Sequence, residues 1–230
     1  MNTHLKRLLV FTGIFMICVP VGTLSHEYGH IAVAAWQGHP TTLHYASMNW
    51  EKSYQEDINQ IDALYTSREE KQKAYRDYGR KVRRESLWVR MGGPLQTMLT
   101  GTIGLVLLLF RKKRIYAKGM KVPDWIAVFL SLFWMREIYN LSLGIGRGIM
   151  NNKNFFNSRQ WDENVINMYF NLPRGTIPIV LACIGLLVVL YVIFRIIPKE
   201  YRLVFISSGF IGGILGAYLW LSFVGPVVLP

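Results

Sequence analysis

Two histidines and a glutamate within five residues are the side chains in this sequence best suited to chemistry. They are His26, Glu27 and His30, in the stretch LSHEYGHIAVAAW. Histidines four residues apart on a helix lie on one face about one turn apart, and two imidazoles at that spacing can bind one zinc ion. Glu27 would then project beside the metal, where it can take a proton from a zinc-bound water. This is the general-base role in the pattern H-E-x-x-H.

The stretch follows an apolar run of the kind that enters a bilayer. Ionisable side chains are costly to bury at membrane depth, and they are therefore functional candidates by default. Three of them occur together here. The membrane setting thus favours a metal site over a chance match to a short pattern.

Length and composition predict the elements that position these residues. The chain has 230 residues, of which 51% are hydrophobic. Several apolar stretches are close in length to the roughly 20 residues that a helix needs to cross a membrane. We expect an all-α, polytopic membrane protein of about five transmembrane helices, forming a single integral membrane domain over residues 1–230, with a short β element after the first helix. The expected spans are 8–23 (continuing as helix to 36), 87–110, 125–149, 177–197 and 203–228. A polar loop over residues 38–86, with a charged and solvated helix at its centre, joins the first two spans.

The formal charge of +12 raises the possibility of a nucleic-acid partner. The basic residues, however, lie mostly in segments that flank apolar spans, where anionic headgroups and membrane topology account for them. We therefore expect no nucleic-acid binding, and the lipid bilayer as the surroundings of the chain. The two cysteines, Cys18 and Cys183, lie within apolar runs and are expected to be packing residues.

Two stretches resemble a known family. HEYGHIAVAAWQGHPTTLHYASMN looks like the first motif of the site-2 proteases, the intramembrane zinc metalloproteases, and MGGPLQTMLTG is similar to the Gly-Pro element of the family's next span. The resemblance implies a multi-pass protein of the bacterial cytoplasmic (inner) membrane that hydrolyses peptide bonds of membrane-embedded or juxtamembrane protein substrates. It also implies zinc as the cofactor, His26 and His30 as ligands and Glu27 as the catalytic residue. Thr97 stands where the family usually has asparagine, and the L-D-G element that supplies the third ligand is absent.

The third ligand must therefore be sought among other acidic residues, and three candidates lie within or beside apolar segments. Asp162 and Glu163, in SRQWDENVINMYFNLP, are separated from the end of the first span by two membrane crossings and so lie on the same side. Their stretch also resembles a divergent bacterial branch of site-2-like proteins. Glu137 lies near the middle of the third span, where Arg136 offers it a partner. We predict Asp162 as the third ligand, with Glu163 and then Glu137 as alternatives.

The segment TTLHYASMN after the first span is expected to be a strand whose free edge faces the zinc ion. Such an edge can hold an extended peptide and expose its backbone for hydrolysis. Two other functions fit the same residues. One is a zinc peptidase working at the membrane surface, like the membrane-bound gluzincins, with Glu137 as third ligand. The other is a non-catalytic membrane scaffold that retains the motif.

Overall fold

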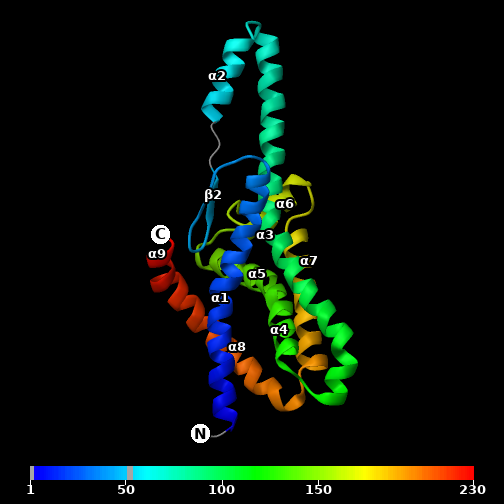
Figure 1. The fold of residues 1–230 in the computed structure, drawn as a ribbon. Helices are drawn as coiled ribbons and strands as arrows, with labels where there is room; N and C mark the ends of the chain where they lie inside the picture. The colour runs from blue at the N-terminus through cyan, green and yellow to red at the C-terminus, as the bar shows by residue number, and fades with distance from the viewer. Residues whose placement is uncertain (1–2, 51–53) are drawn as a thin grey trace.

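The computed structural model describes residues 3–50 and 54–230, and helices dominate it (Figure 1). The elements in chain order are α1 (Thr3–Trp36), β1 (Thr41–Leu43), β2 (Met48–Trp50), α2 (Tyr54–Leu64), α3 (Arg68–Lys118), α4 (Val122–Ser131), η1 (Leu132–Trp134), α5 (Met135–Met150), η2 (Phe155–Asn157), α6 (Asp162–Tyr169), α7 (Thr176–Tyr191), η3 (Val192–Ile196), α8 (Lys199–Leu219), η4 (Trp220–Val224) and α9 (Gly225–Val228).

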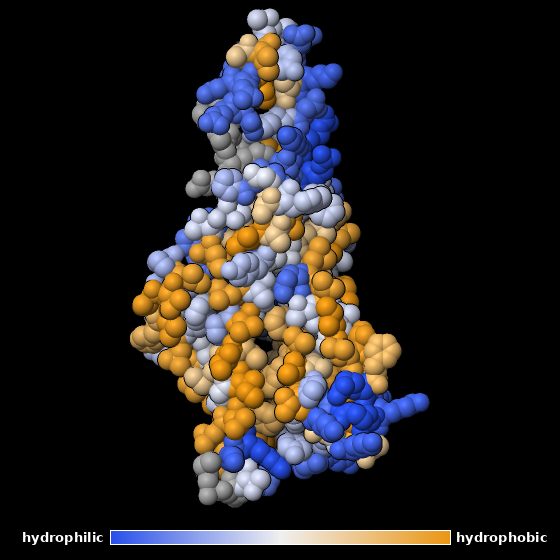
Figure 2. Space-filling model, viewed as in Figure 1, coloured by the Kyte–Doolittle hydropathy of each residue, from blue (hydrophilic) through white to orange (hydrophobic). Residues whose placement is uncertain are grey.

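Five helical segments of the described chain are long and apolar enough to cross a membrane. They comprise residues 3–36, 68–118, 122–150, 176–196 and 199–228. The prediction of an all-α membrane protein with five spans and a short β element is confirmed. Figure 2 shows the corresponding surface, an apolar band with hydrophilic residues above it and at its lower end.

The polar segment between the first two spans is more regular than the loop we expected. Its charged half and the second span form one continuous helix, α3, 51 residues long. The stretch EEKQKAYRDYGRKVRRES contains no proline and is rich in good helix formers, so the helix persists beyond the apolar band. α2 packs against this part of α3, and the two project as a helical hairpin (Figure 1). Residues 51–53 of the segment lie outside the described residues.

Helix α1 packs between α3 and α8. It continues through Pro20 and ends at Trp36, followed by Gly38 at a φ of +80°, a left-handed conformation typical of helix ends. Gly29 of α1 meets Gly92 of α3 so closely that a Cβ on either would overlap the other's carbonyl group. Small residues at this crossing let the two backbones approach each other within the helical turn that carries the histidines.

The main hydrophobic core lies toward the opposite end of α1. The aromatic rings of Phe11 and Phe15 pack against Phe205 of α8, with centroids 5.4 and 5.1 Å apart. The other buried members of this core are Leu108, Ile115, Ala127, Val128, Leu132, Val189, Val192, Ile196 and Ile197. The core therefore ties α1, α3, α4, α7 and α8 together and leaves the far end of α1 to polar residues.

The segment after α1 is a two-stranded hairpin and not the single strand that we expected. β1 and β2 are antiparallel, with Thr42 opposite Asn49, and the amide of His44 donates to the carbonyl of Ser47 (2.8 Å) across the turn. The chain folds back because two short strands then satisfy each other's backbone groups. The hairpin is also anchored to the end of the fifth span, where the indole Nε1 of Trp220 donates to the carbonyl of Tyr45 (2.9 Å).

Candidate metal centre

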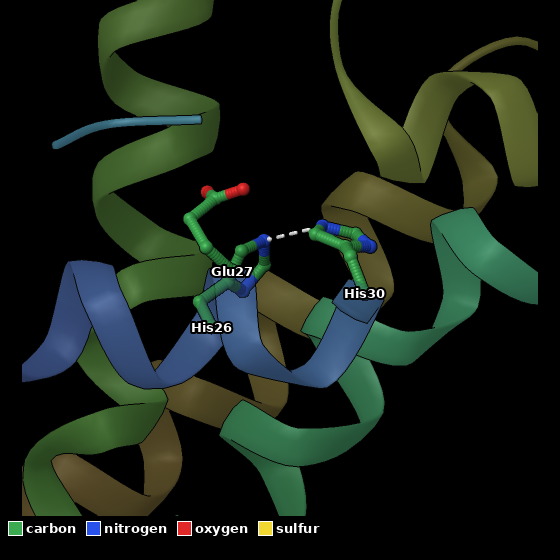
Figure 3. A group of neighbouring side chains, drawn as sticks. All are labelled: His26, Glu27 and His30. Carbon is green, nitrogen blue, oxygen red and sulfur yellow. Dashed lines mark hydrogen bonds between the residues drawn. The ribbon is translucent and has the colours of Figure 1, made fainter. Parts of the chain in front are cut away.

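Three potential metal ligands converge at the end of α1 nearest the hairpin. The Nε2 atoms of His26 and His30 lie 3.2 Å apart, and Oδ2 of Asp162 lies 3.6 Å from the first and 3.2 Å from the second. Figure 3 shows both imidazoles rising from adjacent turns of α1, with the Glu27 carboxylate beside them. Within the described chain, only Asp162 places a carboxylate in ion-pair contact with both imidazoles.

The hydrogen bonds of the other ring nitrogens fix the direction of the lone pairs. Nδ1 of His30 lies 2.6 Å from the carbonyl oxygen of Val89, which can only accept, so this nitrogen donates. Thr97 donates its hydroxyl proton to the carbonyl of Gly93 (3.0 Å) and therefore accepts from Nδ1 of His26 (3.0 Å). The amide of Gly93 also approaches Nδ1 of His30 (3.2 Å), but the shorter contact with Val89 decides the tautomer. In the neutral imidazoles both Nε2 atoms consequently carry the lone pairs.

With neutral imidazoles, two lone pairs and a carboxylate oxygen within 3.6 Å of one another repel unless a proton or a metal cation lies between them. Both imidazoles are buried, so water cannot screen this repulsion. Two histidine nitrogens and one carboxylate oxygen are also a ligand set found at catalytic zinc ions, which keep a fourth position open. The residues at this site therefore fit a divalent cation.

Asp162 is the first residue of α6, and the side chain of Arg90 holds its carboxylate in place. Its second oxygen, Oδ1, accepts a hydrogen bond from Arg90 of α3 (3.2 Å), which leaves Oδ2 for the imidazoles. The Arg90 guanidinium favours the ionised form of this carboxyl group. A metal ligand requires this form.

Gly93 lies directly against the two imidazoles. A Cβ at this position would be no more than 2.5 Å from Nε2 of both His26 and His30. Any side chain here would therefore displace the ring nitrogens. The absence of a side chain at Gly93 therefore leaves space for the metal centre.

Glu27 is buried beside the histidines and borders a polar cavity of about 380 Å³. The backbone amide of Met48, in β2, interacts with its carboxylate. Because His44 and Ser47 are hydrogen-bonded partners, pairing alternates along the hairpin, and the backbone groups of Met48 and Trp50 point away from β1. The unpaired edge of β2 therefore lies at the cavity, next to Glu27.

The two alternative third ligands lie elsewhere. Glu163 is buried, and its Oε1 accepts a hydrogen bond from Asn140 (2.9 Å). Glu137 faces Glu163, and its Oε1 is buried without a hydrogen-bond partner. Arg136, which we expected to form an ion pair with Glu137, lines the cavity instead. Of the three acidic candidates, Asp162 is the one that the fold brings to the histidines.

The roles of several residues that build the site were not predicted from the sequence. Arg90 and Arg136 are charged residues in apolar spans, and this unusual placement was a signal that could have identified them. Thr97 stood out only as a departure from the family pattern, whereas it orients His26. The contribution of Val89 is a backbone carbonyl, which no residue type could have revealed.

The two other histidines near this end of α1 lie apart from the metal centre. Nε2 of His39 lies 3.8 Å from the Glu85 carboxylate, and Nδ1 of His44 contacts the backbone oxygen of Pro230. Neither side chain reaches Nε2 of His26 or His30. Comparison with known proteins adds no further assignment, because no protein-family model, no curated protein and no solved structure matches the chain.

Proposed function

We propose that this multi-pass membrane protein is an intramembrane zinc metalloprotease of the site-2 protease type, residing in a bacterial cytoplasmic membrane. The observation that carries the proposal is the convergence of Nε2 of His26, Nε2 of His30 and Oδ2 of Asp162 beside the carboxylate of Glu27. Three ligands together with a free carboxylate are the parts that metal-assisted hydrolysis needs.

Each residue has a separate task in this reaction. His26, His30 and Asp162 would hold the zinc ion, which when bound supplies Lewis acidity for water activation and carbonyl polarisation. Glu27 accepts the proton of the attacking water and returns it to the leaving amine, as a general base and then a general acid. Thr97, through its hydrogen bond to Nδ1, keeps His26 in the tautomer whose Nε2 is free.

The free edge of β2 supports a membrane-embedded or juxtamembrane polypeptide as the substrate. A peptide bond within a helix is protected by its own hydrogen bonds, so a substrate must be extended where it is cut. The carbonyl of Met48 and the backbone groups of Trp50 point toward the cavity and can pair with such a segment. Pairing at this edge would lay the substrate backbone alongside Glu27.

The test separates metal binding from catalysis. Purified Glu27→Gln should retain equimolar zinc, measured by inductively coupled plasma mass spectrometry, and should lose cleavage of fluorescently labelled casein and of a panel of single-span membrane proteins. His26→Ala and Asp162→Asn should lose both zinc and cleavage. Glu70→Gln, an exposed residue on the projecting part of α3, is the matched control and should retain both.

Two results would contradict the proposal. Cleavage by Glu27→Gln at the wild-type rate would remove the general-base mechanism. Absence of zinc from folded wild-type protein after incubation with zinc would favour the non-catalytic scaffold.

A further inference from the structure

A second cavity lies far from the metal centre, between α3 and the end of α7. It has a volume of about 560 Å³, within the range of about 300 to 1,000 Å³ typical of small-molecule sites. Leu105 contributes from α3, whereas Leu187, Leu190 and Phe194 line it from α7 and η3. Leu187 and Phe194 are 68% and 51% exposed, so the groove opens to the hydrocarbon surroundings and not to the protein interior.

One end of this groove is basic. Arg195 lines it directly. Lys112 lies seven residues after Leu105, two turns along the same face of α3 and about 10 Å nearer the end of the helix. Its Nζ donates to the hydroxyl of Tyr191, which also lines the groove (3.0 Å), and the hydroxyl of Tyr116 donates to the carbonyl of Arg195. Two cations and two phenols thus meet where the apolar groove reaches the membrane surface.

The buried carboxylate near this end, that of Asp124, already has partners. Asp124 is fully buried and binds Arg111 (2.7 Å) and Arg114, as well as the amide of Lys121. Neither Lys112 nor Arg195 forms an ion pair with a carboxylate of the described chain. Figure 2 shows this end as a hydrophilic patch directly below the apolar band. Positive charge therefore remains without a counterion beside the groove.

We propose that this groove is a binding site for one anionic phospholipid. An acyl chain occupies the apolar part along Leu187, Leu190 and Phe194, and the phosphate lies between Lys112 and Arg195. An ammonium and a guanidinium group are both strong phosphate partners, and basic pockets between membrane helices suit anionic headgroups. Charge complementarity selects an anionic lipid over a zwitterionic one, and the open hydrocarbon-facing groove selects a lipid over a soluble anion.

The experiment measures lipid retention by native mass spectrometry of the full chain in a neutral detergent. The probes are palmitoyl-oleoyl phosphatidylglycerol, which is anionic, and palmitoyl-oleoyl phosphatidylcholine, which is zwitterionic. Wild-type protein should retain one phosphatidylglycerol in preference to phosphatidylcholine. Because each cation near a membrane surface contributes about 1 kcal/mol to binding anionic lipid, Lys112→Gln with Arg195→Gln should weaken this binding by about 30-fold.

Two further variants make the test specific. Lys113→Gln with Lys199→Gln removes the same charge from exposed positions near the same end of the molecule, and it should leave binding within about twofold of wild type. Leu190→Trp places a larger side chain in the groove with both cations intact, and it should reduce retention if the acyl chain lies there. Thermal unfolding without lipid establishes that each variant is folded.

Three outcomes would contradict the proposed phospholipid site. Equal weakening by both charge pairs would mean a diffuse electrostatic attraction. Equal retention of both lipids by the wild type would mean a purely apolar surface. A lipid-free dimer that Leu190→Trp dissociates would mean that a second copy of this chain occupies the groove.

Discussion

Replacement of Gly93 by alanine tests the geometry of the metal centre most directly. The added Cβ would stand no more than 2.5 Å from Nε2 of both His26 and His30, whereas ordinary contact begins near 3.4 Å. The ring nitrogens must therefore retreat by about 0.9 Å, several times the tolerance of about 0.2 Å for metal–ligand distances. Loss of an outer hydrogen-bond partner alone weakens metal binding by about 10- to 100-fold. Displacing two ligands should cost at least about 100-fold, or about 2.7 kcal/mol.

Zinc affinity is measured by competition with a chromophoric chelator on purified protein, and folding by circular dichroism. Gly79→Ala is the control, because it is the same change in the same helix with open space around the new Cβ. Alanine in a helix interior is favoured over glycine by about 0.5–1 kcal/mol, so this control should bind zinc normally and unfold no more readily. Wild-type zinc affinity in folded Gly93→Ala would refute the inferred arrangement of the ligands.

Two further predictions concern hydrogen bonds around the site. Thr97→Val removes the acceptor of the His26 Nδ1 proton and should weaken zinc binding by about 10- to 100-fold. Thr97→Ser keeps the hydroxyl and should bind zinc like wild type. Equal zinc affinities of the two variants would contradict the tautomer assignment. Trp220→Phe removes the donor to the Tyr45 carbonyl and should destabilise the hairpin by about 1 kcal/mol. Hydrogen exchange of the hairpin amides should accelerate accordingly, while Trp88→Phe, at a 46% exposed position, should leave it unchanged.

The arrangement of spans was predictable because it depends on local composition. A hydrocarbon layer imposes a minimum helix length, and each apolar run in this chain meets it. The pairing of His26 with His30 was equally local, since helix geometry alone sets a separation of four residues on one face. Identification of Asp162 as a candidate needed one further rule, the parity of membrane crossings, which placed its loop on the correct side.

Contacts between distant segments do not follow from local composition or helix geometry. The fold-back of the hairpin depends on what the segment packs against, and the sequence pattern gave no register for it. Which of Asp162 and Glu163 contacts the histidines also depends on tertiary packing. Adjacent residues at the start of a helix point in different directions, so one carboxylate reaches the histidines and the other reaches Asn140.

The sequence by itself determined which side chains could bind a metal, that they lie on one helical face and that this helix spans a membrane. The tertiary structure decided how those side chains are held. Val89 and Thr97 fix the ring tautomers, Arg90 takes one oxygen of Asp162, and Gly93 leaves room beside the imidazoles. The physical reason is that ligand type and helical spacing are properties of neighbouring residues, whereas lone-pair direction and free volume arise only where α1, α3 and α6 meet.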